Sequence, residues 1–146
     1  MSAMSDYLEV ALRKHLFRTG TDALWSSKPT VVAIALCTAT PTDASTGSTI
    51  TEPPDANGYD RQTLNPLDAN WTAASAVDGL TDNASAITFG PCITTAWNQV
   101  THVAICDNAT YGAGNIWFWA ALTTPRTVIV GDSLVFAIGA LDITFA

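Results

Sequence analysis

Most apolar residues of this chain fall in short runs that are rich in β-branched and aromatic types and separated by turn-forming residues. Such runs are typical of β-strands, and their close spacing predicts an all-β fold, either a β-sandwich or a jelly-roll-like barrel. Only residues 5–20 show helical periodicity, which predicts one N-terminal amphipathic α-helix capped by Ser5 or Asp6. We therefore expect an N-terminal helical attachment segment, residues 1–20, and a single β domain, residues 21–146.

The expected strands alternate with irregular segments that are long for a compact domain. Strands are predicted over residues 30–38, 59–64, 86–89, 100–106, 116–122, 127–130, 133–138 and 141–146, with irregular segments over 38–58, 65–84 and 107–115. Within residues 116–122, Trp117 and Trp119 are expected on one face, and Ile116 and Phe118 on the other. Because both faces are apolar, this strand is expected at the centre of a sheet or beneath a partner chain.

His102 and Cys106 are the residues that most resemble a catalytic or metal-binding pair. On a strand they share one face but lie about 13 Å apart, because a strand rises roughly 3.3 Å per residue. That separation exceeds hydrogen-bond reach, so a nucleophile and base pair is not expected, and one metal ion would not be held by both. We interpret them as a half-buried sheet histidine and a small buried thiol.

The charge of the chain is low and acidic, with 13% charged residues against about 25% in average proteins and a net charge of −7. Nucleic-acid binding is not expected, because phosphate contacts need a basic surface. Residues 1–30 nevertheless hold four of the six basic residues, and the remainder has a net charge of −8. Either the helix simply carries its usual cations, or the N-terminal segment docks on an acidic surface.

The three cysteines, Cys37, Cys92 and Cys106, lack the spacing of a zinc site and cannot all pair within one chain. We expect buried, reduced thiols in a protein made in the cytoplasm. No signal peptide and no membrane span are expected, because the sequence has neither an apolar signal core nor an apolar run of about 20 residues. Asn-x-Ser/Thr triplets are common by chance in a chain rich in threonine and carry no weight without secretion.

Known catalytic and cofactor motifs give no lead. Residues 55–60, "DANGYD", are similar to a calcium loop, but their glycine stands fourth instead of sixth and the bidentate glutamate of that loop has no counterpart. Phosphate-binding loops, nucleophile elbows and zinc-protease motifs have no match. The 13 carboxylates could include a glycosidase pair, but nothing in one sequence selects two of them. We therefore expect no enzyme activity, no metal and no cofactor.

The order of several short motifs resembles a family of small virion structural proteins of tailed bacteriophages. Members typically read S-x-Y-L-E, G-Y-x-R, a W-G-x-V-T-H strand and a closing G-D-x-L-x-F hairpin. The corresponding stretches here are "SDYLEVALRKHLFR", "GYDRQ", "ITFGP", "AWNQVTH", "GNIWFWAAL" and "PRTVIVGDSLVF". The resemblance covers nearly the whole chain, and it departs from the family at Asn98, where glycine is common.

This resemblance implies an all-β accessory protein of the virion without catalysis. Capsid decoration, as a cement subunit that bridges neighbouring shell proteins, is the expected role. A tail, baseplate or tail-fibre component and a carbohydrate-binding β-sandwich are the alternatives. The expected partners are the major capsid protein or tail proteins, together with other copies of this chain, for which a trimer is one candidate assembly.

Interface residues are predicted from exposed helical positions and from an excess of large aromatic side chains. Leu8, Leu12 and Leu16 form the helical stripe, which is expected either to attach the protein to a partner or to pack on its own sheet. Aromatic anchors dominate the energy of many interfaces. The complete predicted set is Tyr7, Leu8, Leu12, Arg13, Leu16, Trp71, Trp97, Trp117 and Trp119.

Overall fold

The computed structural model describes residues 3–17, 29–73 and 79–144. In that part of the chain, one α-helix and seven strands are present, together with one short 3-10 helix. Their bounds are β1 Ala3–Met4, α1 Asp6–Phe17, β2 Ala33–Cys37, η1 Asp55–Asn57, β3 Gln62–Thr63, β4 Ile87–Phe89, β5 Val100–Cys106, β6 Ile116–Arg126 and β7 Leu134–Phe136. The boundary predicted near residue 20 lies outside the described residues.

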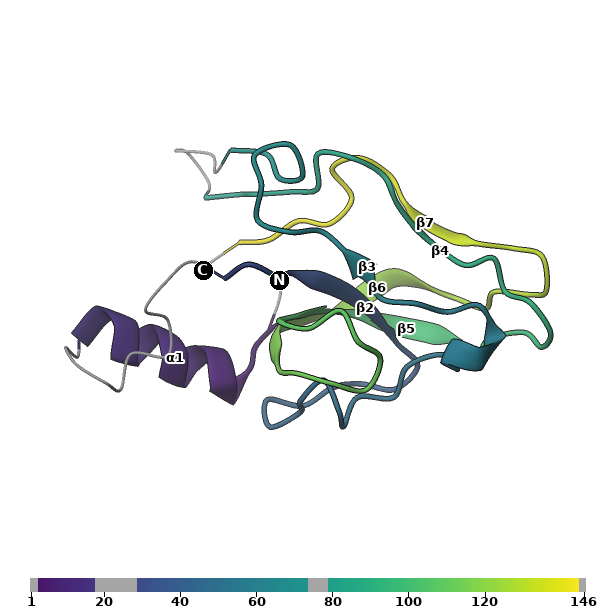
Figure 1. The fold of residues 1–146 in the computed structure, drawn as a ribbon, viewed down its shortest axis with the longest axis horizontal. Helices are drawn as coiled ribbons and strands as arrows, with labels where there is room; N and C mark the ends of the chain where they lie inside the picture. Colours follow the sequence, from purple (N-terminus) through teal and green to yellow (C-terminus); the bar gives the residue numbers. More distant parts are fainter. Residues whose placement is uncertain (1–2, 18–28, 74–78, 145–146) are drawn as a thin grey trace.

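The strands form two antiparallel sheets that lie one over the other (Figure 1). The larger sheet has the strand order β1-β6-β5-β2-β3, and the smaller sheet contains β4 and β7. β6 is an internal strand of the larger sheet, as its two apolar faces predicted. The all-β class with a single N-terminal helix is confirmed, in the form of a sandwich-like arrangement whose described strands do not close into a barrel.

Strand pairing confirms which residues of β5 share a face. His102 pairs with Cys37 of β2, and Cys106 pairs with Ala33, so His102 and Cys106 lie four positions apart on the same face. The register between β5 and β6 shifts twice: first between Val100 and His102, and again near the end of β5, where Ile105 pairs with Phe118 but Cys106 pairs with Ile116.

The second shift is a bulge that leaves Trp117 as the extra residue, and a bulge reverses the alternation of side chains. Ile116 therefore joins Trp119 on one face, and Trp117 joins Phe118 in the main core. The predicted faces of Ile116 and Trp117 were wrong, because the apolar pattern of a strand does not reveal an inserted residue.

Each face of the larger sheet is covered by a different kind of structure. The face toward β4 and β7 forms the main core with large side chains, among them Ile34, Phe89 and Trp97. The opposite face carries small side chains, and it is covered by the long segment after β2, which contributes Ile50. The fully buried residues of this second cluster are Ala35, Cys37, Ala104, Cys106 and Ile116.

Two predicted strands are absent from the part of the chain that the structure describes. Residues 127–130 lead into a turn, in which the Gly131 N–H donates to the carbonyl of Cys92 at 2.9 Å. Residues 141–144 make one isolated bridge, between Ile143 and Thr81, and residues 145–146 lie outside the described residues. Both segments have strand-like side chains, but their backbone groups bond to loops, so propensity alone was misleading.

Helix α1 is attached to the larger sheet at its first turn. The Leu8 N–H donates to Ser5 Oγ at 3.3 Å, and the Ser5 N–H donates to the carbonyl of Trp117 at 3.0 Å. Leu8 and Ala11 are buried, whereas Leu16 is 62% exposed. Figure 1 shows α1 running away from the sheets toward its C-terminal end. The predicted stripe therefore divides, with its first half packed on the protein's own sheet and its last residue exposed.

This division predicts different costs for two leucines of the same helix. Leu8→Ala should lower the free energy of unfolding by about 2–5 kcal/mol, because it leaves a cavity in the core. Leu16→Ala should change it by about 0.5 kcal/mol or less, as exposed positions do. Urea unfolding of the two variants measures both values, and equal losses would contradict the described packing.

Candidate functional site

Glu52 and Arg61 carry the described charges that are fully buried, and they form an ion pair. We call the long segment after β2 and the loop between β5 and β6, which this pair connects, the loop layer. Arg61 Nη2 lies 2.6 Å from Glu52 Oε1, and Arg61 Nε lies 3.0 Å from Glu52 Oε2. The guanidinium therefore binds the carboxylate through two parallel contacts, the geometry in which arginine binds carboxylates most strongly. Arg61 directly precedes β3, and Glu52 belongs to the long segment after β2.

The remaining donors of Arg61 bind backbone carbonyls in two separate loops. Nη2 donates to the carbonyl of Gly47 at 2.7 Å, and Nη1 donates to those of Asn108 and Ala113 at 2.9 and 2.7 Å. One side chain thus joins the segment after β2, the loop between β5 and β6, and the start of β3. Buried carbonyls need such partners, because leaving one unpaired costs free energy.

Tyr59 connects this ion pair to the larger sheet. Its hydroxyl donates to Glu52 Oε2 at 2.6 Å and accepts the N–H of Leu36 at 2.9 Å. Burial raises the pKa of Tyr59, and the negative charge of Glu52 raises it further, so the phenol stays protonated. Burial by itself would lower the pKa of Arg61. Its bonds to Glu52 more than offset this effect, so the pKa of Arg61 lies above its ordinary value. We call Glu52, Tyr59 and Arg61 the Arg61 clamp.

The loops that the clamp joins approach each other too closely for a side chain at Gly47. A Cβ atom at this position would lie 2.0 Å from the carbonyl oxygen of Ala113. The Gly47 N–H also donates to the carbonyl of Gly114 at 2.8 Å. The close approach requires glycine here, because backbone atoms cannot move aside as a flexible side chain can.

Two buried asparagines hold other loops in the same manner. Asn57 Oδ1 accepts the N–H groups of Thr94 and Thr95 at 2.7 and 3.0 Å, and its backbone carbonyl accepts Trp97 Nε1 at 3.1 Å. Asn83 Nδ2 donates to the carbonyl of Ala137 at 2.8 Å. No sequence pattern singled out Glu52 or Asn83, and Asn57 stood out only as part of the calcium-like segment, residues 55–60. Tyr59 and Arg61 had a signal in the G-Y-x-R motif.

The histidine and thiols of the larger sheet do not form a reactive pair. His102 is half-buried, its Nδ1 lies 2.8 Å from Thr101 Oγ1, and burial lowers its pKa. Its direct neighbour across the sheet is Cys37, a pairing for which the sequence carries no signal. Burial raises the pKa of the Cys37 thiol above its usual value and that of Cys106 to about 12. A nucleophilic cysteine needs a lowered pKa, so these thiols are structural.

The structure offers no cation site in the calcium-like segment. Residues Asp55–Asn57 form a 3-10 turn, and the side-chain oxygen of Asn57 already accepts backbone N–H groups. Across residues 3–17, 29–73 and 79–144, no three His, Cys, Asp or Glu side chains gather closely enough to hold a metal ion. Within the same ranges, no helix is long and apolar enough to span a membrane.

The predicted interface residues are dispersed over the molecule and differ in exposure. Leu8, Trp97 and Trp117 are buried inside the chain, where a partner would not reach them. Trp97 contacts Tyr59 edge to face, with ring centroids 5.6 Å apart, so this aromatic mass serves the core. The half-buried members are Tyr7, Leu12, Trp71 and Trp119, and the exposed members are Arg13 and Leu16. For these six, a role in an interface stays a prediction.

Comparison with known proteins identifies the family. Residues 3–144 match the family Gp80, described as podophage GP4 fiber I protein gp80. The chain belongs to the Gp80 family. No curated protein matches the sequence. Membership of Gp80 confirms the resemblance to virion structural proteins of phages. The protein therefore belongs to the virion, and its partners are other virion proteins.

The Arg61 clamp predicts a large and specific loss of stability when its cation is removed. Arg61→Met should lower the free energy of unfolding by about 3–5 kcal/mol, because it leaves the Glu52 carboxylate buried without its partner. Arg61→Lys should also destabilise the protein, since one ammonium cannot reproduce the planar arrangement of five donors. Arg126→Met is the matched control, because Arg126 is exposed. A loss no larger than that of the control would refute the clamp.

Burial of the thiols predicts slow modification and an alkaline loss of stability. Because their pKa values are raised, Cys37 and Cys106 should react with a disulfide reagent at pH 8 only after denaturation. The raised native pKa of a buried thiol such as Cys106 stabilises the fold, and this contribution is fully present below the pKa of the unfolded state, near 9. It is lost as the pH rises through the native pKa, about 12. Thiol titration and unfolding curves at increasing pH test both points. Rapid reaction of the folded protein would contradict them.

Proposed function

We propose that this protein is a non-enzymatic subunit of a podophage tail fibre or of the attachment of that fibre to the tail. The observation that carries the proposal is the match to a fibre family over residues 3–144, which is nearly the whole chain. The buried polar groups support a structural role, because Glu52, Tyr59 and Arg61 are bound to one another and to loops instead of facing a cleft.

Capsid decoration, the role first expected from the sequence, remains a second candidate. Its support is compositional: a net charge of −7 suits an exterior surface better than one that faces packaged DNA. Carbohydrate binding has weaker support. Sugars stack on exposed aromatic rings, and the exposed residues among the described aromatic ones are Phe17, at 82%, and Tyr111, at 40%, in the loop between β5 and β6.

Copy number in purified virions discriminates between the two stations. The number of copies of a fibre subunit per particle should be a small multiple of the order of the tail's rotational symmetry. A decoration protein should approach the copy number of the major capsid protein. Quantitative mass spectrometry of intact particles gives the ratio, and the same measurement on tails detached from capsids gives the location. The fibre proposal predicts that the protein stays with the tails. Recovery with empty capsids would favour decoration, and absence from particles would overturn both.

A further inference from the structure

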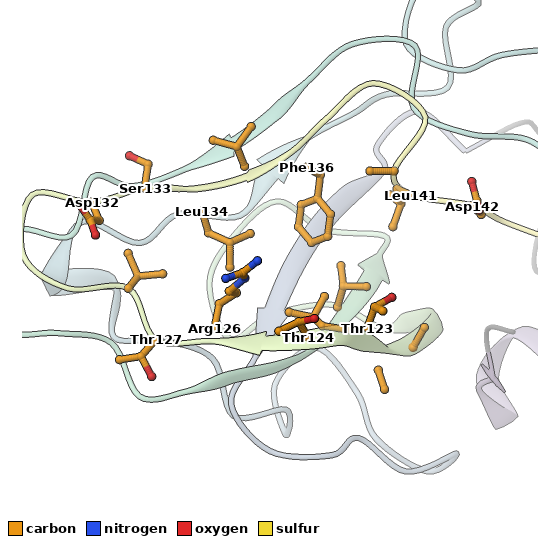
Figure 2. A pocket seen from close by; sticks show the side chains of 17 residues that line it. Thr123, Thr124, Arg126, Thr127, Asp132, Ser133, Leu134, Phe136, Leu141 and Asp142 are labelled. Carbon is orange, nitrogen blue, oxygen red and sulfur yellow. The ribbon is translucent and has the colours of Figure 1, made fainter.

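A groove of about 730 Å³ lies between β6 of the larger sheet and β7 of the smaller one (Figure 2). Consecutive residues line it on both sides, 120–124 from β6 and 132–136 around β7. Alternate side chains of a strand point to opposite faces, so a groove lined by consecutive residues runs along the strand edges. Among the described residues, β1 pairs with β6 only at Phe118 and Trp119, which leaves this edge open.

The groove is lined by both apolar and polar side chains, with charges at defined positions. Leu122 and Phe136 are half-buried and supply apolar surface, whereas Leu134 and Leu141 are buried. Figure 2 shows Asp132 and Asp142 near opposite ends of the groove and Arg126 between them. Asp132, Asp142 and Arg126 are all exposed. This pattern suits an apolar anchor that carries basic residues beside it.

The C-terminal end of α1 has these properties. Phe17 is 82% exposed and Leu16 is 62% exposed, although both are large apolar side chains. Arg13 and Lys14 stand beside them, and α1 has no acidic residue after Glu9. We call Arg13, Lys14, Leu16 and Phe17 the helix tip.

We infer that the helix tip of one copy docks in the groove between β6 and β7 of a second copy. Phe17 and Leu16 contact the apolar side chains of Leu122 and Phe136, while Arg13 and Lys14 approach the carboxylates of Asp132 and Asp142. Arg126 lines the groove, and we expect its guanidinium to stack on the ring of the docked Phe17, since arginine binds aromatic faces. An aromatic anchor surrounded by polar contacts is the usual arrangement of an interface hot spot.

The occupant is a second copy because the groove of the same copy is out of reach. In Figure 1, α1 leaves the larger sheet at its first turn and runs away from β7, so its tip points away from the groove. Charge favours the same partner: past residue 30 the chain has two basic residues and ten acidic ones, so its body attracts the cationic tip of a neighbour. Tip and groove are different surfaces, which makes the contact head-to-tail and the assembly a ring or a filament.

Sedimentation velocity of the full chain over a concentration series tests this contact. The wild-type protein should associate, and Leu16→Asp or Phe17→Asp should weaken association by about tenfold or more, as loss of a hot-spot residue does. Leu67→Asp is the matched control, because Leu67 is 60% exposed and lies outside the groove. Melting temperatures should show that all these variants fold. The inference does not depend on whether the protein belongs to the tail or to the capsid.

Mixing experiments distinguish this contact from other modes of association. Phe17→Asp retains an intact groove, and the double variant Asp132→Lys/Asp142→Lys retains an intact tip, so each should be monomeric alone and the two should form a one-to-one dimer when mixed. Adding Arg13→Asp/Lys14→Asp to the groove variant should restore self-association through reversed charges.

Four outcomes would overturn the inference. The first is a wild-type chain that stays monomeric at every concentration, and the second is a Leu67→Asp control that associates as weakly as Leu16→Asp. The third is folded variants that fail to pair when mixed. The fourth is groove variants that self-associate normally but fail to join particles. The last result would assign the groove to another virion protein.

Discussion

The guanidinium of Arg61 is the interaction on which the loop layer of this protein depends. One face of the larger sheet is covered by a second sheet, but the other is covered by segments without regular structure. Such segments carry backbone carbonyls that no strand can satisfy. Arg61 binds three of them, in Gly47, Asn108 and Ala113, and Glu52 neutralises its charge. The small alanine and cysteine side chains beneath these loops match this arrangement, because they let the loops lie close to the sheet.

The sequence predicted the elements whose side chains alone determine their structure. Helix α1 and strands β2, β5 and β6 follow from apolar periodicity, and β-branched residues in β2 and β5 distinguish these strands from helix. The register shift at Trp117 was not predictable, because it depends on how β6 pairs with β5, and the sequence of β6 alone does not show that pairing. Residues 127–130 and 141–144 have strand-like side chains, but their backbone groups bond to loops instead of forming a ladder.

The candidate site was less predictable than the fold. Tyr59 and Arg61 belong to a recognisable motif, but their partner Glu52 lies in a polar segment where one acidic residue looks like any other. Only the folded chain brings Glu52, Gly47 and the loop after β5 together around Arg61. The same limit applies to Trp97 and Trp117, since a large aromatic residue fits an interface and a core equally well until burial is known.

Amide hydrogen exchange on Arg61→Lys, compared with the wild-type protein, tests most directly whether Arg61 holds the loop layer together. The Gly112 N–H bonds to Glu52 Oε1 at 3.4 Å, and the Gly47 N–H bonds to Gly114, so both report on the loops, whereas Ala104 reports on the sheet. In the variant, we expect the amides of Gly47 and Gly112 both to exchange much faster than in the wild-type protein, while the amide of Ala104 stays protected. Unchanged protection of Gly47 and Gly112, or an equal loss at Ala104, would contradict the role assigned to Arg61.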